Sequence, residues 1–219
     1  MTTSHPTTVK FCGFTQIQDI HAAIQLGADA IGLVLYPQSP RAISVEDAIA
    51  LAKAVPAFTT LVALVVNMPE QELVYLAHHL PFDIIQFHGD ESALQCQLMA
   101  DRVCKRWIKA IRVQPSDTTE SLLAQLHELA KLGASGALLD AYHPDKFGGT
   151  GEHFDWDKIP KHSPLPIILA GGLTADNVVD AIMQTGVYGV DVSGGIESAK
   201  GKKDPKKMTD FLAKVCKLA

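Results

Sequence analysis

The chain has 219 residues, of which 47% are hydrophobic, and its formal net charge at pH 7 is −5. This length and apolar content suit one deep core, and we expect 1–219 to form a single domain. The acidic balance argues against nucleic acid as a partner. The basic run at 199–207 is the exception, and we interpret it as the solvated start of a helix.

Targeting and redox signals are also weak. No apolar run approaches the ~20 residues that span a bilayer, and the segment 1–8 lacks the basic start and apolar core of a secretory signal. We therefore expect a cytoplasmic protein with no membrane partner. The four cysteines are scattered without a C-x-x-C pair, and no metal-binding histidine spacing occurs, so neither disulfides nor a metal site is predicted.

Short apolar runs rich in β-branched residues alternate along the chain with longer segments of helical periodicity. Strands are predicted at 9–12, 30–36, 59–67, 83–89, 104–113, 136–140, 166–172 and 188–194. Helices are predicted at 15–28, 44–56, 69–81, 90–100, 116–134, 174–186 and 204–219. The connection 141–166 is predicted as a long loop with at most one helical turn. Its first part, 141–155, is either a mobile lid or a merely flexible connection.

This alternation predicts the fold class. Strands that alternate with helices run parallel and are joined by right-handed crossovers. An open doubly wound sheet and a closed barrel both satisfy that rule. Eight units in 219 residues, with no visible linker, favour an α/β fold of the (βα)8 barrel type. In such barrels, active sites lie at the carboxyl ends of the strands.

Cys12 ends the first predicted strand, beside Lys10 and before Gly13. Cysteine is among the most buried residue types, so an inert core thiol is the default interpretation. A strand-end thiol near a lysine could instead be partly ionised, and a thiolate serves as nucleophile or base.

Three further strand-end side chains suit a site at the same edge. Asp140 closes an apolar strand, where it either caps an Asx-turn or acts as a proton donor. Arg41 ends a proline-stiffened loop, from which a guanidinium can grip a carboxylate. His88 either hydrogen-bonds a substrate or has a structural hydrogen bond only.

Two glycine pairs follow the last two predicted strands. Gly171 and Gly172 precede a helix, and Ser193, Gly194 and Gly195 come one unit later. In barrels, the loops after the seventh and eighth strands commonly bind phosphate through backbone N–H groups. This pattern favours a phosphate site over two ordinary turns. No G-x-x-x-x-G-K-[ST] motif is present, so a P-loop nucleotide site is not predicted.

Taken together, the motifs resemble those of one enzyme family. "VKFCG", "YPQSPR", "QFHGDE", "FGGTGEHFDW", "LAGGLTADNV" and "DVSGGIE" occur in the order found in phosphoribosylanthranilate isomerases. The resemblance runs from about Val9 to the C-terminus. It implies a (βα)8 barrel that converts N-(5-phosphoribosyl)anthranilate into an aminodeoxyribulose phosphate, an Amadori rearrangement in tryptophan biosynthesis that uses no metal or organic cofactor.

The resemblance also implies a role for each matching residue. Cys12 corresponds to the family's general base and Asp140 to its general acid. Arg41 corresponds to the residue that holds the anthranilate carboxylate, while His88 and Asp191 line the substrate pocket. The phosphate is cradled by Gly171 and Gly172 and by Ser193, Gly194 and Gly195.

One motif departs from the family pattern. The last motif usually resembles "DVSSG", and Gly194 lacks the hydroxyl of the second serine. We expect backbone N–H groups still to bind the phosphate, with somewhat lower affinity. No fused second catalytic half is visible, which implies a monofunctional chain, either a monomer or a homodimer. Two alternatives remain open: another phosphosugar isomerase of the barrel type, or a phosphosugar-binding barrel without activity.

Overall fold

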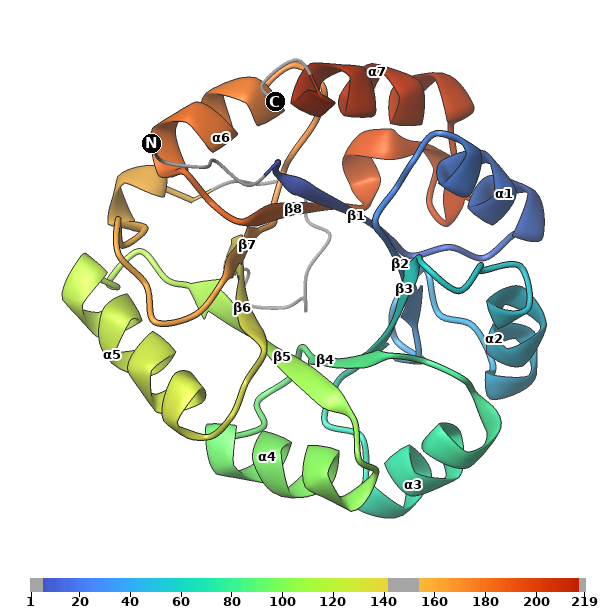
Figure 1. Ribbon diagram of the computed structural model, residues 1–219, viewed down its shortest axis with the longest axis horizontal. Helices are drawn as coiled ribbons and strands as arrows, with labels where there is room; N and C mark the ends of the chain where they lie inside the picture. The colour runs from blue at the N-terminus through green and yellow to red at the C-terminus, as the bar shows by residue number, and fades with distance from the viewer. Residues whose placement is uncertain (1–5, 142–153, 217–219) are drawn as a thin grey trace.

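The computed structural model describes residues 6–141 and 154–216, and within them eight parallel strands close into a barrel in the order β1 to β8 (Figure 1). The barrel strands are β1 (Thr8–Cys12), β2 (Ala30–Val34), β3 (Thr60–Val65), β4 (Ile84–Phe87), β5 (Arg106–Val113), β6 (Gly136–Ala141), β7 (Ile167–Leu169) and β8 (Gly189–Val192). Each strand predicted from the sequence is present. The prediction of a closed barrel rather than an open sheet is confirmed, because β1 pairs with β8.

Helices surround the barrel as an outer ring (Figure 1). They are α1 (Ile17–Gln25), α2 (Val45–Ala52), α3 (Glu70–His79), α4 (Ala93–Arg102), α5 (Thr119–Lys131), α6 (Val178–Thr185) and α7 (Pro205–Cys216). The starts of α2, α4 and α5 follow from N-cap side chains that accept free backbone N–H groups. Ser44 caps α2 as predicted by accepting from the N–H of Asp47, and Ser92 forms a capping box with Gln95 at α4.

The connection between β6 and β7 contains one 3-10 turn, η1 (Trp156–Lys158), in its described part, as expected. The predicted lid at 141–155 falls almost wholly outside the described residues. Two features before α7 were not predicted: the 3-10 turn η2 (Gly194–Ile196), and an antiparallel hairpin formed by β9 (Glu197–Ala199) and β10 (Lys202–Lys203).

Alternation along each strand separates two layers of side chains. On β1, Val9 and Phe11 join the main core between sheet and helices, where the Phe11 ring meets that of Phe211 on α7 edge-on. Lys10 and Cys12 lie on the other face of the same strand. This face lines the barrel interior, and it carries the polar groups from which the site is built.

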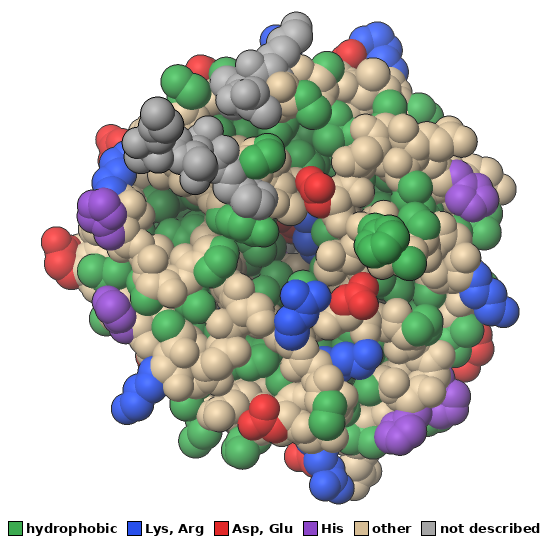
Figure 2. Space-filling view, viewed as in Figure 1, with side chains coloured by type: hydrophobic (Ala, Val, Ile, Leu, Met, Phe, Trp, Pro, Cys, Tyr) green, Lys and Arg blue, Asp and Glu red, His purple; other side chains and the backbone are tan. Residues whose placement is uncertain are grey.

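Charged side chains of both signs are interspersed on the face of the molecule that Figure 2 shows. Within residues 6–141 and 154–216, no helix is long and apolar enough to span a membrane.

Candidate active site

The polar residues predicted at the strand ends are buried at one end of the barrel. Cys12, His88, Asp140 and Asp191 each expose less than a tenth of their surface. Parallel strands bring their carboxyl ends to a common rim, so residues from β1, β4, β6 and β8 surround one barrel mouth. Cys12 and Asp140 lie on opposite sides of β7 and β8, which separate β6 from β1 in the barrel.

A buried ion pair lies beside Cys12. Lys10 and Asp191 are register partners on β1 and β8, and Lys10 Nζ is 2.8 Å from Asp191 Oδ1. Burial opposes the charged form of Lys10, but the interactions with Asp191 and Cys12 together outweigh burial, so the pKa of the Lys10 ammonium is raised. A Cβ built on Gly32 would lie 2.6 Å from Cys12 Sγ and 3.0 Å from Lys10 Nζ, so the thiol and the ammonium occupy neighbouring positions against β2.

Burial and neighbouring charges act on the Cys12 thiol in opposite directions. Burial raises the pKa of the Cys12 thiol above its ordinary value. The positive charge of Lys10 acts in the opposite direction without overcoming burial, and the negative charge of Asp191 adds to the increase. Burial thus opposes formation of the Cys12 thiolate, and Lys10 is the first neighbouring group that favours it.

Asp140 belongs to a hydrogen-bonded chain of buried side chains. Its Oδ1 accepts from the N–H of Ala141 at 2.9 Å, and its Oδ2 lies 3.2 Å from His88 Nε2. The other ring nitrogen of His88 lies 2.9 Å from Nε2 of Gln86. The bond to Ala141 is the local turn contact expected of an aspartate at a strand end. The contact with His88 joins β6 to β4 across the mouth.

Arg41 is buried and paired with a residue that the sequence analysis did not single out. Its Nε and Nη2 donate to Oε1 and Oε2 of Glu197 on β9, at 2.7 and 2.8 Å. Burial opposes the negative charge of Glu197, yet the hydrogen bond from Arg41 and the charge of Lys203 outweigh burial and lower the pKa of Glu197. Arg41 thus enters the mouth with its orientation set by a two-bond clamp.

Lys203 on β10 connects this clamp to the ends of β1 and β8. The side chain is 1% exposed, and its Nζ donates to the carbonyl of Cys12 at 2.6 Å and to Glu197 Oε1 at 2.9 Å. It also lies 3.3 Å from the carbonyl oxygen of Ser193, whose hydroxyl donates to the carbonyl of Cys12 at 2.9 Å. The hairpin therefore ties the thiol-bearing strand to the loop after β8.

The two predicted glycine loops lie against each other. A Cβ on Gly195 would be 1.9 Å from the carbonyl oxygen of Leu173, so only glycine lets the loop after β8 approach the loop after β7 so closely. Gly171 lies over Asp140, since its Cβ would be 2.9 Å from Asp140 Oδ1. Gly172 adopts a positive φ of 62°, and Gly194 lies near Arg41. The structure thus places the first loop beside Asp140 and the second beside Arg41.

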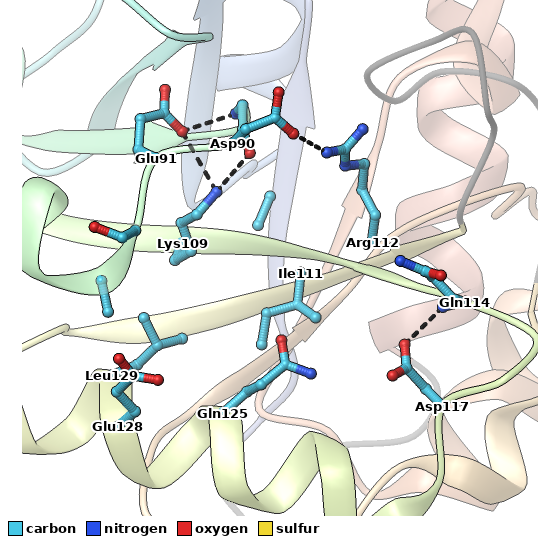
Figure 3. Close-up of a pocket in the computed structure, with 14 residues that line it drawn as sticks. Asp90, Glu91, Lys109, Ile111, Arg112, Gln114, Asp117, Gln125, Glu128 and Leu129 are labelled. Atoms are coloured by element: carbon cyan, nitrogen blue, oxygen red, sulfur yellow. Dashed lines mark hydrogen bonds and ion pairs between the residues drawn. The ribbon is translucent and has the colours of Figure 1, made fainter.

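A separate hollow of about 350 Å³ lies outside the barrel, between β5, α5 and the loop before α4 (Figure 3). Lys109 there reaches the carbonyl of Gly89 at 2.8 Å and Glu91 Oε2 at 3.4 Å, while Arg112 pairs with Asp90 (Figure 3). These contacts hold the β4–α4 loop to β5. None of the predicted catalytic or phosphate residues lines this hollow.

Sequence reasoning missed Gln86, Glu197 and Lys203. Gln86 could have been found, because period-two alternation places it on the same face of its strand as His88. Lys203 gave no such signal, since it lies in the basic run at 199–207, whose composition indicates a solvated surface. Glu197 ends the motif "DVSGGIE", but nothing in the sequence pairs it with Arg41.

Comparison with known proteins identifies a consistent set of relatives. The family model described as N-(5'phosphoribosyl)anthranilate (PRA) isomerase matches residues 9–214. The N-(5'-phosphoribosyl)anthranilate isomerase of Acinetobacter calcoaceticus is 46% identical over 206 residues, which is 94% of this chain and 95% of the relative. That of Pseudomonas putida strain GB-1 is 48% identical over 94% of this chain and 96% of the relative.

Solved structures agree with these matches. Phosphoribosyl anthranilate isomerase from Thermotoga maritima superposes with a TM-score of 0.81 at 31% identity, covering 96% of this chain and 99% of that one. Another matching structure is that of a phosphoribosyl anthranilate isomerase in complex with reduced 1-(o-carboxyphenylamino)-1-deoxyribulose 5-phosphate. It has a TM-score of 0.79 at 30% identity and covers 96% of this chain and 99% of that one.

Proposed function

The chain belongs to the N-(5'-phosphoribosyl)anthranilate isomerase family and catalyses that isomerisation in tryptophan biosynthesis, and from this we propose that Cys12 is its general base and Asp140 its general acid. The observation that carries the proposal is the pair of buried, oriented groups at one barrel mouth: a thiol beside an ammonium, and a carboxyl that contacts an imidazole.

The substrate binds across the mouth by its two anionic ends. The loops at 171–173 and 193–195 receive the phosphate, because barrel loops at these positions present backbone N–H groups to phosphate oxygens. The anthranilate carboxylate binds the part of the Arg41 guanidinium that Glu197 leaves available. Support comes from the related isomerase solved with a reduced product, a molecule that carries both a carboxyl and a phosphate.

The first step opens the sugar ring. Asp140 gives its proton to the ring oxygen while the bond from C1′ to that oxygen breaks, and the anthranilate nitrogen supplies the electron pair that forms an iminium. The proton donor must be held within hydrogen-bond reach of that oxygen. His88 and the N–H of Ala141 hold the Asp140 carboxyl in place.

The second step removes the proton from C2′. The iminium makes this proton acidic. The Cys12 thiol, whose pKa is raised by burial, first loses its proton to water, and the resulting thiolate takes the C2′ proton to give an enolamine. Lys10 provides the positive charge that favours the thiolate, and the cationic iminium adds to it. Asp191 holds Lys10 in place and thereby acts on Cys12 indirectly.

The third step is ketonisation, in which C1′ gains a proton and the C2′ hydroxyl loses one. Over the whole reaction the substrate neither gains nor loses protons. Cys12 is left as the thiol, as it began, and Asp140, left as the carboxylate, regains a proton from water. The reaction is therefore an internal redox isomerisation that needs only a positioned acid and base.

A single domain over 1–219, a cytoplasmic location and a monomeric or homodimeric state remain predictions. For the last, one related structure describes monomers generated from the dimeric enzyme of Thermotoga maritima.

Replacing the thiol tests the assignment of the base. We expect Cys12→Ala to lower kcat by about 10²–10⁴-fold, because a general base contributes on that order. The assay follows the loss of fluorescence as fresh N-(5-phosphoribosyl)anthranilate is consumed.

Cys96→Ala is the matched control. Cys96 is equally buried, and burial raises its pKa to about 12, but it lies on α4. We expect this variant to keep near-normal turnover. Equal losses of kcat in Cys12→Ala and Cys96→Ala, or normal turnover in Cys12→Ala, would show that Cys12 is not the general base.

A further inference from the structure

Gln86 is a fully buried amide in the barrel interior, and the proposed mechanism does not use it. It lies on β4, with Leu64 of β3 and Ile108 of β5 as its register partners. Its exposure is 0%, and among the described residues its Oε1 has no hydrogen-bond partner. An unmatched buried acceptor costs free energy of folding. The position therefore calls for a role other than stability.

The contact that Gln86 makes is with His88. Nε2 of the amide lies 2.9 Å from Nδ1 of the imidazole. An amide nitrogen only donates, so Nδ1 must carry the lone pair and accept. In a neutral imidazole the proton is then on Nε2, and that nitrogen lies 3.2 Å from Asp140 Oδ2. The amide thus decides which His88 nitrogen presents a proton to Asp140.

We propose that Gln86 is a positioning residue that holds His88 in the Nε2–H tautomer, so that its N–H points at the Asp140 carboxyl. This inference rests on the proposed role of Asp140 as general acid. When Asp140 gives its proton to the ring oxygen, negative charge develops on Oδ2. A donor already directed at that oxygen binds the developing carboxylate more strongly than the neutral acid, and such an interaction increases kcat rather than substrate affinity.

Removing the amide tests the role in catalysis. Gln86→Met keeps the length of the side chain but offers His88 neither donor nor acceptor. We expect kcat to fall about tenfold and KM to stay within about twofold, as for other residues that orient a functional histidine. Gln97→Met on α4 is the same chemical change away from the mouth, and we expect it to leave both constants unchanged.

A double-mutant cycle separates positioning from mere packing. If Gln86 acts through His88, adding Gln86→Met to His88→Ala costs less than about twofold further in kcat, because the residue it positions is gone. If Gln86→Met lowers kcat as much in the His88→Ala background as in the unchanged enzyme, the inference is overturned.

Imidazole ¹⁵N NMR gives a readout that does not depend on activity. We expect His88 of the unchanged enzyme to carry its proton on Nε2 at neutral pH, and Gln86→Glu, whose carboxylate accepts a hydrogen bond, to place a proton on Nδ1. A proton on Nδ1 in the unchanged enzyme overturns the inference even if Gln86→Met fails to fold.

The two proposals fail in different ways. Normal turnover in Asp140→Asn would refute the general acid while leaving the observed tautomer intact. A large loss in Asp140→Asn together with normal kcat in Gln86→Met would refute the positioning role alone.

Discussion

At the scale of single residues, the site depends on how burial and neighbouring charges act on Cys12. Cys12, His88 and Asp140 were visible in the sequence as strand-end positions, but the effect of burial on the Cys12 thiol was not. Burial raises the pKa of the thiol more than Lys10 lowers it, and the depth of a side chain cannot be inferred from its neighbours in sequence.

This balance predicts the reactivity of Cys12 toward alkylation. In a background where the other three cysteines are serine, inactivation by iodoacetamide should be slow at pH 7 and accelerate beyond pH 9, because only the thiolate reacts and the pKa of Cys12 is raised above 9.0. Lys10→Met should slow the reaction further, since it removes a charge that lowers this pKa. A faster reaction in Lys10→Met would contradict the electrostatic account.

At the scale of elements, the loops after β7 and β8 were predicted as a phosphate cradle from their glycines, and the structure shows why one of them has to be glycine. A Cβ on Gly195 would collide with the carbonyl oxygen of Leu173, whereas one on Gly194 would meet only Arg41 Nη2 at 3.4 Å. Gly194, where the family motif usually has serine, is therefore the position at which an added side chain would meet no backbone atom.

The two neighbouring glycines therefore form a matched pair of tests. Gly195→Ala should move the loop and raise KM about tenfold or more, since a displaced phosphate contact weakens substrate binding. Gly194→Ala and Gly194→Ser should leave KM within about threefold. Steady-state kinetics with varied substrate decides, and a tolerated Gly195→Ala would show that the cradle does not depend on this close approach.

The β9–β10 hairpin is the element that sequence reasoning missed. Its lysines were interpreted as a solvated surface, because a run of like charges usually is one. Lys203 is instead buried by a tertiary contact, since the chain folds back over the end of β1 and supplies Glu197 as its partner.

At the scale of the whole molecule, the architecture follows from periodicity. Alternating apolar runs and amphipathic segments specify parallel strands with covering helices, and eight such units close into a barrel. Long-range polar contacts do not follow from periodicity. His88 with Asp140, and Arg41 with Glu197, join segments through geometry that exists only once the barrel has closed.

The loss of folding stability at acid pH should depend on the ion pair between Arg41 and Glu197. The pKa of Glu197 is lowered in the folded state, so its ionisation stabilises the fold fully above the ordinary value of 4.5 and progressively less as the pH falls through the folded-state pKa. At pH 7, Glu197→Gln should reduce the free energy of unfolding by about 1–3 kcal/mol.

Urea unfolding at a series of pH values checks this prediction. The difference between the unchanged protein and Glu197→Gln should shrink as the pH falls below 4.5. A difference that stays constant with pH would show that charge is not what the clamp contributes.

The most direct test of the acid–base account compares turnover with binding in Cys12→Ala and Asp140→Asn. Each variant is assayed for kcat, and its affinity for reduced 1-(o-carboxyphenylamino)-1-deoxyribulose 5-phosphate is measured by calorimetry. We predict that kcat falls about 10²-fold or more in both variants while the dissociation constant stays within a few-fold. Turnover within tenfold of normal in either variant, or a loss of binding equal to the loss of kcat, would contradict the account.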